Sequence, residues 1–187
     1  MTTDPRDDLF RAADLAGDLL ETVRAEDHHL RTPCAEWSVL DLVGHLVAVT
    51  RRVAHIGRGG LPGDLATMAS GEPAQGWGPA YRAGVAEMRT VWADDALLTR
   101  TVTHPAGPMP GGAAATVYVQ EFATHAGDLA VAIGRTDLLD EELAETALAD
   151  SMRFVPRDRT GFPFGDPVEV PADAPAHVRL AAWLGRG

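Results

Sequence analysis

The chain has 187 residues, one cysteine and a formal net charge of −11, from 27 acidic and 16 basic residues. Such an acidic surface repels phosphate backbones, so the sequence argues against nucleic-acid binding, and we interpret the charge as a means of solubility. Because Cys34 has no partner cysteine within the chain, an intrachain disulfide is excluded, which agrees with a reducing cytoplasm.

Neither secretion nor membrane insertion is expected. The first ten residues lack the basic and apolar regions of a secretory signal. The most apolar stretch, Val39 to Val49, is interrupted by polar residues and is far shorter than the ~20 apolar residues that span a bilayer. A chain of this length can bury roughly 70% of its unfolded surface. We therefore expect one cytoplasmic domain over residues 1–187, with a core over about 5–155 and a C-terminal extension over about 156–187.

The first expected helix covers residues 5–24. Thr3 or Asp4 can cap its N-terminus, and Pro5 suits the first turn because its φ is already helical. Apolar side chains recur along it at helical spacing, at Leu9, Ala13, Ala16, Leu20 and Val23. A connection over residues 28–37 then leads to the second helix.

The second expected helix begins after Ser38 and ends near Gly57. Ser38 suits the N-cap position, and Asp41 matches the acidic partner of a capping box. Its apolar stripe contains Leu42, Leu46, Val49, Val53 and Ile56. The following residues, 57–78, form a loop rich in glycine and proline, and loops of this length are often lids or mobile segments.

A third helix is expected to start at Pro79, with Tyr81, Val85, Met88 and Trp92 on one face. Residues 96–112 are expected to be irregular, apart from a short strand within 97–103. The reason is a run of prolines that disfavours regular structure, namely Pro105, Pro108 and Pro110.

A fourth helix is expected over residues 113–133, with Gly134 as its C-terminal stop, and a fifth over 137–154. The tail should hold a short extended piece and a last short helix capped by Asp173 and ended by Gly185. Four long amphipathic helices joined by loops predict an all-α bundle. The long second and third connections argue against a simple up-and-down array.

One face of the fourth helix carries the residues with the clearest chemistry. Glu121 and His125 are four residues apart, so their side chains lie on the same face, about 5–6 Å apart at Cβ. A carboxylate and an imidazole are good ligands for a divalent metal such as zinc, and His45 on the second helix is the candidate third ligand. Three protein ligands would leave a position open for water or a substrate thiolate. The alternative is a Glu–His hydrogen bond, with His45 a satisfied core histidine.

Two motifs resemble a known family. The run TPCAEWSV at residues 32–39, followed by DLVGHL at 41–46, is similar to the T-P-C-x-x-W-x-V-x-D-L-x-x-H-L signature. That signature belongs to the mycothiol-dependent maleylpyruvate isomerase N-terminal-like proteins of the DinB-like superfamily. Residues 121–130 resemble the family's second motif, E-x-x-x-H-x-W-D-L-A, and the chain's ending is also similar to family endings.

The resemblance implies a DinB-like four-helix bundle with metal ligands at His45, Glu121 and His125. Gly127 stands where the second motif has tryptophan, so the neighbouring pocket should be wider or differently shaped. The isomerase carries a further C-terminal domain, which this chain has no room for, and its catalytic arginine cannot be placed on this sequence. We therefore expect metal and thiol chemistry rather than maleylpyruvate isomerisation itself.

Other residues have structural interpretations beside functional ones. Asp128 can orient a metal-bound histidine or pair with a nearby arginine. Trp37 and Tyr118 are interpreted as packing residues, and Cys34 as a small core side chain without a base to activate it. We expect three further histidines at the surface, namely His28, His29 and His55. His104, which precedes a proline, is expected in a loop.

Three functions remain open on the sequence. The leading hypothesis is a metal-dependent enzyme, with zinc favoured and nickel the alternative. It would use mycothiol or another low-molecular-weight thiol for S-transfer to, or isomerisation of, a small electrophilic substrate. The second is a hydrolase with a metal-bound water. The third is a non-catalytic binding or regulatory module. A homodimer is the default assembly for such bundles.

Overall fold

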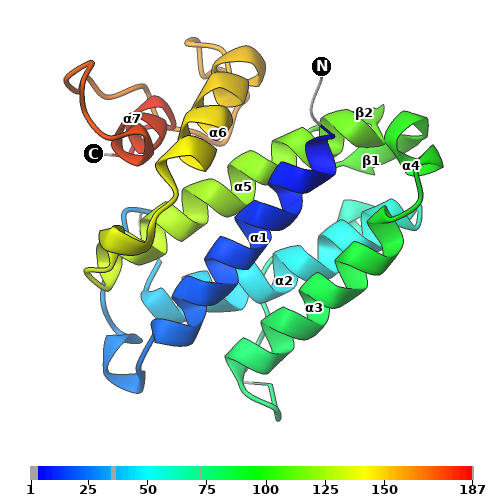
Figure 1. The fold of residues 1–187 in the computed structure, drawn as a ribbon, viewed down its shortest axis with the longest axis horizontal. Coiled ribbons are helices and arrows are strands. Elements are labelled where there is room, and N and C mark those ends of the chain that lie inside the picture. The colour runs from blue at the N-terminus through cyan, green and yellow to red at the C-terminus, as the bar shows by residue number, and fades with distance from the viewer. Residues whose placement is uncertain (1–3, 35–36, 72, 187) are drawn as a thin grey trace.

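The computed structural model describes residues 4–34, 37–71 and 73–186 (Figure 1). Helices dominate the described chain, and its regular strands form one small hairpin. The elements are α1 (Pro5–Thr22), α2 (Val39–Gly57), α3 (Trp77–Trp92), α4 (Ala96–Thr99), β1 (Thr101–His104), β2 (Gly107–Pro110), α5 (Gly111–Ala132), α6 (Glu141–Phe154) and α7 (Ala176–Trp183), with 3₁₀ turns η1 (Ala25–Asp27), η2 (Pro62–Asp64) and η3 (Thr136–Leu138). The predicted all-α class is confirmed.

Four long helices form the bundle. Helix α1 packs against α5 and α3, and α2 packs against α3 and α5, so the four lie side by side as a closed ring of neighbours (Figure 1). Helices α6 and α7 pack on each other and on α5, while the hairpin lies at the N-terminal end of α5 (Figure 1). Within the described residues, every helix is too short or too polar to cross a membrane.

The starts of α1 and α2 follow their predicted caps. The Asp4 carboxylate accepts a hydrogen bond from the Arg6 N–H at 2.9 Å, while Thr3, the alternative cap, lies outside the described residues. Ser38 and Asp41 exchange hydrogen bonds between side chain and backbone, which completes the capping box. These contacts supply acceptors for N–H groups that a helix start leaves unpaired, so both helices begin where local chemistry places them.

Two large aromatic residues of α3 hold the centre of the bundle. Tyr81 and Trp92 are fully buried. The Tyr81 hydroxyl donates to the Ala13 carbonyl of α1 at 2.7 Å, and the Trp92 indole N–H donates to the Val53 carbonyl of α2 at 3.0 Å. Each side chain therefore combines a large apolar contact with a satisfied polar atom, and α3 is tied to two neighbouring helices.

Two helical glycines differ in the space around them. A Cβ atom on Gly84 of α3 would lie 2.0 Å from the Thr50 hydroxyl of α2, whereas nothing lies within 4 Å of a Cβ on Gly127 of α5. We expect Gly84→Ala to lower the free energy of unfolding by about 1–3 kcal/mol through overpacking. Gly127→Ala should raise it by about 0.5–1 kcal/mol, because alanine loses less backbone entropy in a helix. Urea denaturation measures both, and a stabilising Gly84→Ala would contradict the close α2–α3 contact.

The prediction for residues 96–112 was partly wrong. This segment begins with the short helix α4, and the strand expected within 97–103 is β1, displaced to Thr101–His104. Pro108 and Pro110 lie within β2, opposite Thr103 and Thr101 of β1. They occupy alternate positions of a two-stranded ladder, where backbone N–H groups can point away from the partner strand. A proline there costs no ladder hydrogen bond.

The loop between α2 and α3 is fastened to α2 at the level of His45. The Ala69 N–H donates to the Gly44 carbonyl at 3.1 Å, and the Thr67 carbonyl accepts a hydrogen bond from His45 Nδ1 at 2.9 Å. Gly44 permits this approach, since a Cβ there would lie 3.2 Å from the Ala69 carbonyl oxygen. This part of the loop is thus a fixed cover over one face of α2.

The chain returns to α5 after the last helix. Helix α7 begins at Ala176, after Pro175, so the predicted cap at Asp173 was wrong. Gly185 has a φ of +79°, a conformation that glycine adopts without strain. The turn at this glycine follows α7 directly and brings Arg186 back towards the bundle.

Candidate metal centre

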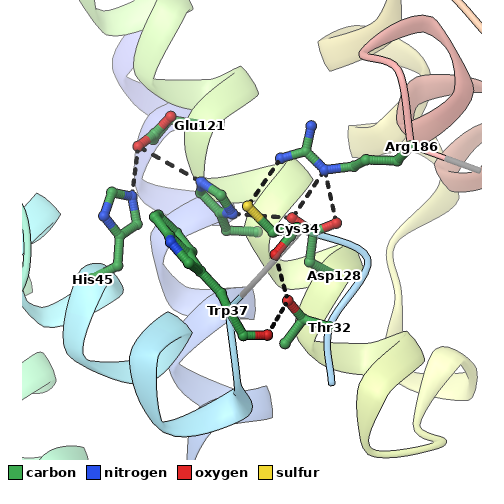
Figure 2. Close-up of polar contacts among 8 residues, drawn as sticks. Thr32, Cys34, Trp37, His45, Glu121, Asp128 and Arg186 are labelled. Atoms are coloured by element: carbon green, nitrogen blue, oxygen red, sulfur yellow. Dashed lines mark hydrogen bonds and ion pairs between the residues drawn. The ribbon is translucent and has the colours of Figure 1, made fainter. Parts of the chain in front are cut away.

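The three predicted ligands meet where α2 packs on α5. His45 comes from α2 and Glu121 from α5 (Figure 2). His125 also lies on α5. The Glu121 Oε1 atom lies 3.0 Å from His45 Nε2 and 3.9 Å from His125 Nε2. One ligand atom from each residue lies within 4.8 Å of the other two. The helical spacing and the proposed pairing of α2 with α5 therefore bring the three side chains to one place.

Hydrogen bonds on the far side of each imidazole determine where its lone pair points. His45 Nδ1 lies 2.9 Å from the Thr67 carbonyl oxygen, and a carbonyl can only accept, so Nδ1 carries the proton. His125 Nδ1 lies 3.0 Å from Asp128 Oδ2, where an ionised carboxylate again can only accept. When the rings are neutral, both Nε2 atoms are bare acceptors that face Glu121.

Glu121 is also an acceptor at neutral pH. Burial opposes its ionisation, but while the imidazoles are protonated, the hydrogen bond from His45 and the positive charges of His125, His45 and Arg52 outweigh burial and lower the pKa of the carboxyl to about 2. Once the imidazoles are neutral, two nitrogen lone pairs and one carboxylate converge. Acceptors at this separation repel one another unless a proton or a metal cation lies among them, so the donor set fits a divalent metal.

Asp128 contacts both a histidine and an arginine, the two kinds of partner that the sequence left open. Its side chain is 1% exposed, and it accepts the His125 Nδ1 proton. It also accepts hydrogen bonds from Arg186 Nε, at 2.9 Å to Oδ1 and 3.1 Å to Oδ2 (Figure 2). A carboxylate behind a metal-binding histidine is a common way to fix the ring and its tautomer. The sequence analysis missed Arg186, whose one signal was its place in the family-like ending.

Trp37 covers the two imidazoles. Its ring centroid lies 4.7 Å from that of His45 and 5.7 Å from that of His125, the second pair being stacked. The Thr32 N–H and hydroxyl both donate to the Trp37 carbonyl, each at 3.1 Å, which fixes the backbone of Trp37 (Figure 2). The packing role predicted for Trp37 is confirmed, and the residues that it packs on are the candidate ligands.

Cys34 lies beside the site rather than in the core, so its predicted placement was wrong. It is half-buried, with Sγ 3.9 Å from Arg186 Nη2 (Figure 2). Burial raises the pKa of the thiol, so it is protonated at neutral pH. Cys34, His125 and Asp128 also lie close enough to surround a cation. However, the Arg186 guanidinium already occupies the Asp128 carboxylate, and a second cation there would be repelled.

Replacing Cys34 with serine therefore should not change metal binding. We expect Cys34→Ser to bind the same amount of zinc per chain as the wild-type protein, because its thiol is not one of the converging acceptors. Metal content after dialysis, measured by mass spectrometry, tests this. A loss of zinc in Cys34→Ser would instead assign the metal to the group of Cys34, His125 and Asp128.

The other weighed residues lie in different settings. His29 is exposed and His28 half-buried, and His55 is partly exposed, with Nε2 2.7 Å from an Asp64 carboxylate oxygen. His104 was expected in a loop but lies in β1, where it is buried. Tyr118 is buried and packs edge-on against His104, with ring centroids 4.8 Å apart.

Gly127 lines a cavity of about 360 Å³ between α5 and α7. The lining is mainly apolar, with Val131 and Leu180 among its walls, and it reaches Asp128 and Arg186. The absence of a side chain at this position therefore leaves open space beside the ion pair that supports His125.

The chain is similar to known proteins over most of its length. The family model of the mycothiol maleylpyruvate isomerase N-terminal domain matches residues 9–130. The chain belongs to this family. All three candidate ligands of this isomerase-domain protein lie within the matched span. Two Mycobacterium tuberculosis proteins, Uncharacterized protein MT0763 (strain CDC 1551 / Oshkosh) and Uncharacterized protein Rv0738 (strain ATCC 25618 / H37Rv), are each 34% identical over 180 residues, which is 94% of this chain and 94% of theirs. No solved structure matches the chain significantly.

Proposed function

We propose that this protein is a metal-dependent enzyme that joins a low-molecular-weight thiol to a small electrophile, or uses the thiol to isomerise one. The observation that carries the proposal is the set of three acceptors, His45 Nε2, His125 Nε2 and Glu121 Oε1, which face one another with no donor among them when the imidazoles are neutral. Zinc is the favoured metal because it binds imidazole and carboxylate well, and nickel is the alternative. Membership of the mycothiol isomerase domain family makes mycothiol the favoured thiol.

The chemistry follows from what these residues can hold. A bound divalent metal lowers the pKa of a coordinating thiol and so supplies a thiolate at neutral pH. Three protein ligands leave room for such a co-substrate, which is typical of catalytic sites. Thr67 and Asp128 hold the two imidazoles in the tautomer that presents Nε2. Trp37 covers both rings and limits the access of water from that side.

The test is thiol-dependent turnover. The protein, purified without an affinity tag or chelator, is loaded with zinc or nickel and mixed with mycothiol and a chromogenic electrophile such as 1-chloro-2,4-dinitrobenzene. We expect conjugate to form faster than without protein, and the increase to disappear when either metal or thiol is withheld. A panel of α,β-unsaturated and halogenated acceptors extends the test beyond one electrophile.

The remaining outcomes separate the other two functions. Hydrolysis of esters or amides by the metal-loaded protein without thiol would indicate a hydrolase with an activated water. Protein that takes up neither metal, and that keeps its stability when His125 is replaced, would indicate a non-catalytic module in which the Glu–His cluster is a buried polar network. Either result would contradict the thiol-dependent proposal.

A further inference from the structure

A buried arginine next to the metal centre has almost no acceptor. Arg52 of α2 is 7% exposed. Its partner among the described residues is the Ala66 carbonyl, 3.3 Å from Nη2, and no carboxylate of that part of the chain lies within 4.0 Å of its guanidinium. A guanidinium has five N–H donors, and buried charges are seldom left without a counter-charge. Arg52 thus keeps several N–H donors that no described residue accepts.

His104 presents a second free donor. Burial lowers its pKa to about 4, so the imidazole is neutral at pH 7. Its Nδ1 accepts a hydrogen bond from the Ala106 N–H at 3.0 Å, and therefore the proton of the neutral ring is on Nε2. Within the described ranges, that Nε2–H donates to no acceptor.

The hydroxyl of Tyr118 is a third donor without an acceptor among the described residues. The residue is 3% exposed, and its hydroxyl is buried without a hydrogen-bond partner in the part of the chain that the structure describes. Leaving a buried hydroxyl unpaired costs about 1–3 kcal/mol. Its ring lies against His104, with centroids 4.8 Å apart, so the two free donors belong to adjacent side chains.

These donors lie in the layer of the bundle next to the metal centre. Helices α2 and α5 run in opposite directions, because Arg100, which precedes the hairpin, contacts Gly57 at the end of α2 and Gly111 at the start of α5. Arg52 is two turns after His45, and Tyr118 is one turn before Glu121, so both are displaced towards the same end. Arg52 and Glu121 are each close enough to His104 and Tyr118 to influence their ionisation.

We propose that Arg52, His104 and Tyr118 form an oxyanion-binding subsite that takes a carboxylate of the acceptor substrate. The planar guanidinium matches a carboxylate in a two-pronged hydrogen bond, and the neutral imidazole and phenol supply further donors. One cation and two neutral donors suit a monoanion better than a phosphate dianion. The role as substrate subsite rests on the proposed function, but the binding of a carboxylate can be measured by itself.

Metal and carboxylate should bind cooperatively. The negative charge of Glu121 influences His104 and Tyr118, and it also repels an incoming anion. A divalent cation at His45, Glu121 and His125 would neutralise that carboxylate, which leaves the positive charge of Arg52 to the substrate. Replacing Glu121 with glutamine removes the same negative charge without any metal.

The test is calorimetric titration with acetate and fumarate at fixed ionic strength, with acetamide as neutral isostere and inorganic phosphate as the competing anion. We expect zinc-loaded protein to bind acetate and fumarate more tightly than acetamide or inorganic phosphate. Arg52→Gln should weaken binding about 10-fold or more, and Tyr118→Phe about 2- to 10-fold, in line with charged and neutral hydrogen bonds. Arg51→Gln, an exposed neighbour on α2, should bind like the wild type.

Three results would overturn the subsite: unchanged carboxylate binding in Arg52→Gln and Tyr118→Phe, preference for phosphate, or no carboxylate binding by either zinc-loaded protein or metal-free Glu121→Gln. Carboxylate binding by Glu121→Gln in a protein that never takes up zinc would support the subsite while the proposed function fails. The melting temperature of Arg52→Gln without ligand should change little, because the substitution removes one long hydrogen bond and a charge interaction with Glu121 that acts over more than 4.0 Å, and it also relieves the burial of a charge. A large fall would assign Arg52 a structural role and contradict the proposal.

Discussion

Replacing His125 with alanine is expected to abolish stable metal binding. The substitution removes one of three converging acceptors and leaves Glu121 and His45 at 3.0 Å with no third ligand. The loss in zinc affinity should exceed the ~10- to 100-fold that follows when only the hydrogen-bonded partner of a ligand is removed. Zinc at about 1,000 times the wild-type dissociation constant should stabilise the wild-type protein by about 4 kcal/mol, and a variant that binds zinc more than ~100-fold more weakly by less than about 1.4 kcal/mol. Metal content and thermal unfolding with and without zinc measure both effects.

His29→Ala is the matched control for this experiment. His29 is exposed and is neither a candidate ligand nor a hydrogen-bond partner of one, so its loss should leave zinc content and the zinc-dependent rise in melting temperature unchanged. Full zinc occupancy in His125→Ala, or an equal loss in both variants, would show that zinc binds elsewhere on the chain.

Replacing Asp128 with alanine should lower both the stability of the fold and the zinc affinity of the candidate metal centre. Arg186 would lose its carboxylate, and removing one partner of a buried pair typically costs 3–5 kcal/mol. The Arg186 side chain keeps 12% exposure, so we expect the lower end, about 3 kcal/mol of unfolding free energy. His125 would lose the acceptor that fixes its tautomer, which should lower zinc affinity about 10- to 100-fold. Urea denaturation of the metal-free protein and zinc titration separate these effects.

Arg186→Gln distinguishes the two roles of Asp128. This variant breaks the ion pair but keeps the hydrogen bond between Asp128 and His125 Nδ1. Stability should therefore fall, while zinc affinity stays close to that of the wild type. If Arg186→Gln lost zinc as fully as Asp128→Ala, the orientation of His125 would depend on the C-terminal segment rather than on Asp128 alone.

The elements that local chemistry determines could be predicted from the sequence. Helix α2 starts at its capping box, since Ser38 and Asp41 are three residues apart and need no distant partner. The same holds for the pairing of Glu121 with His125, which helical periodicity places on one face in any fold. His45 required the further inference that α2 packs on α5, which the apolar stripe of α2 and the family resemblance both favoured.

Features that depend on contacts distant in sequence could not be predicted. The approach of Arg186 to Asp128 joins residues 58 positions apart, and its contact with Cys34 spans 152 positions. Prolines in β2 are tolerated because of where they fall in the ladder, which composition does not reveal. The backbone carbonyl of Thr67 has no sequence signal at all, although it determines the tautomer of His45.

Consecutive peptide groups of one loop support two different parts of the site. The Ala66 carbonyl accepts from Arg52 and the Thr67 carbonyl from His45, while both side chains are exposed. Substitutions at these two positions should therefore have little effect on the site. A one-residue insertion between them would shift both carbonyls out of register and harm the two parts together, whereas an insertion between the exposed residues Ala74 and Gln75 should be tolerated. What selection preserves here is the length and path of the backbone, which residue identities among relatives would not reveal.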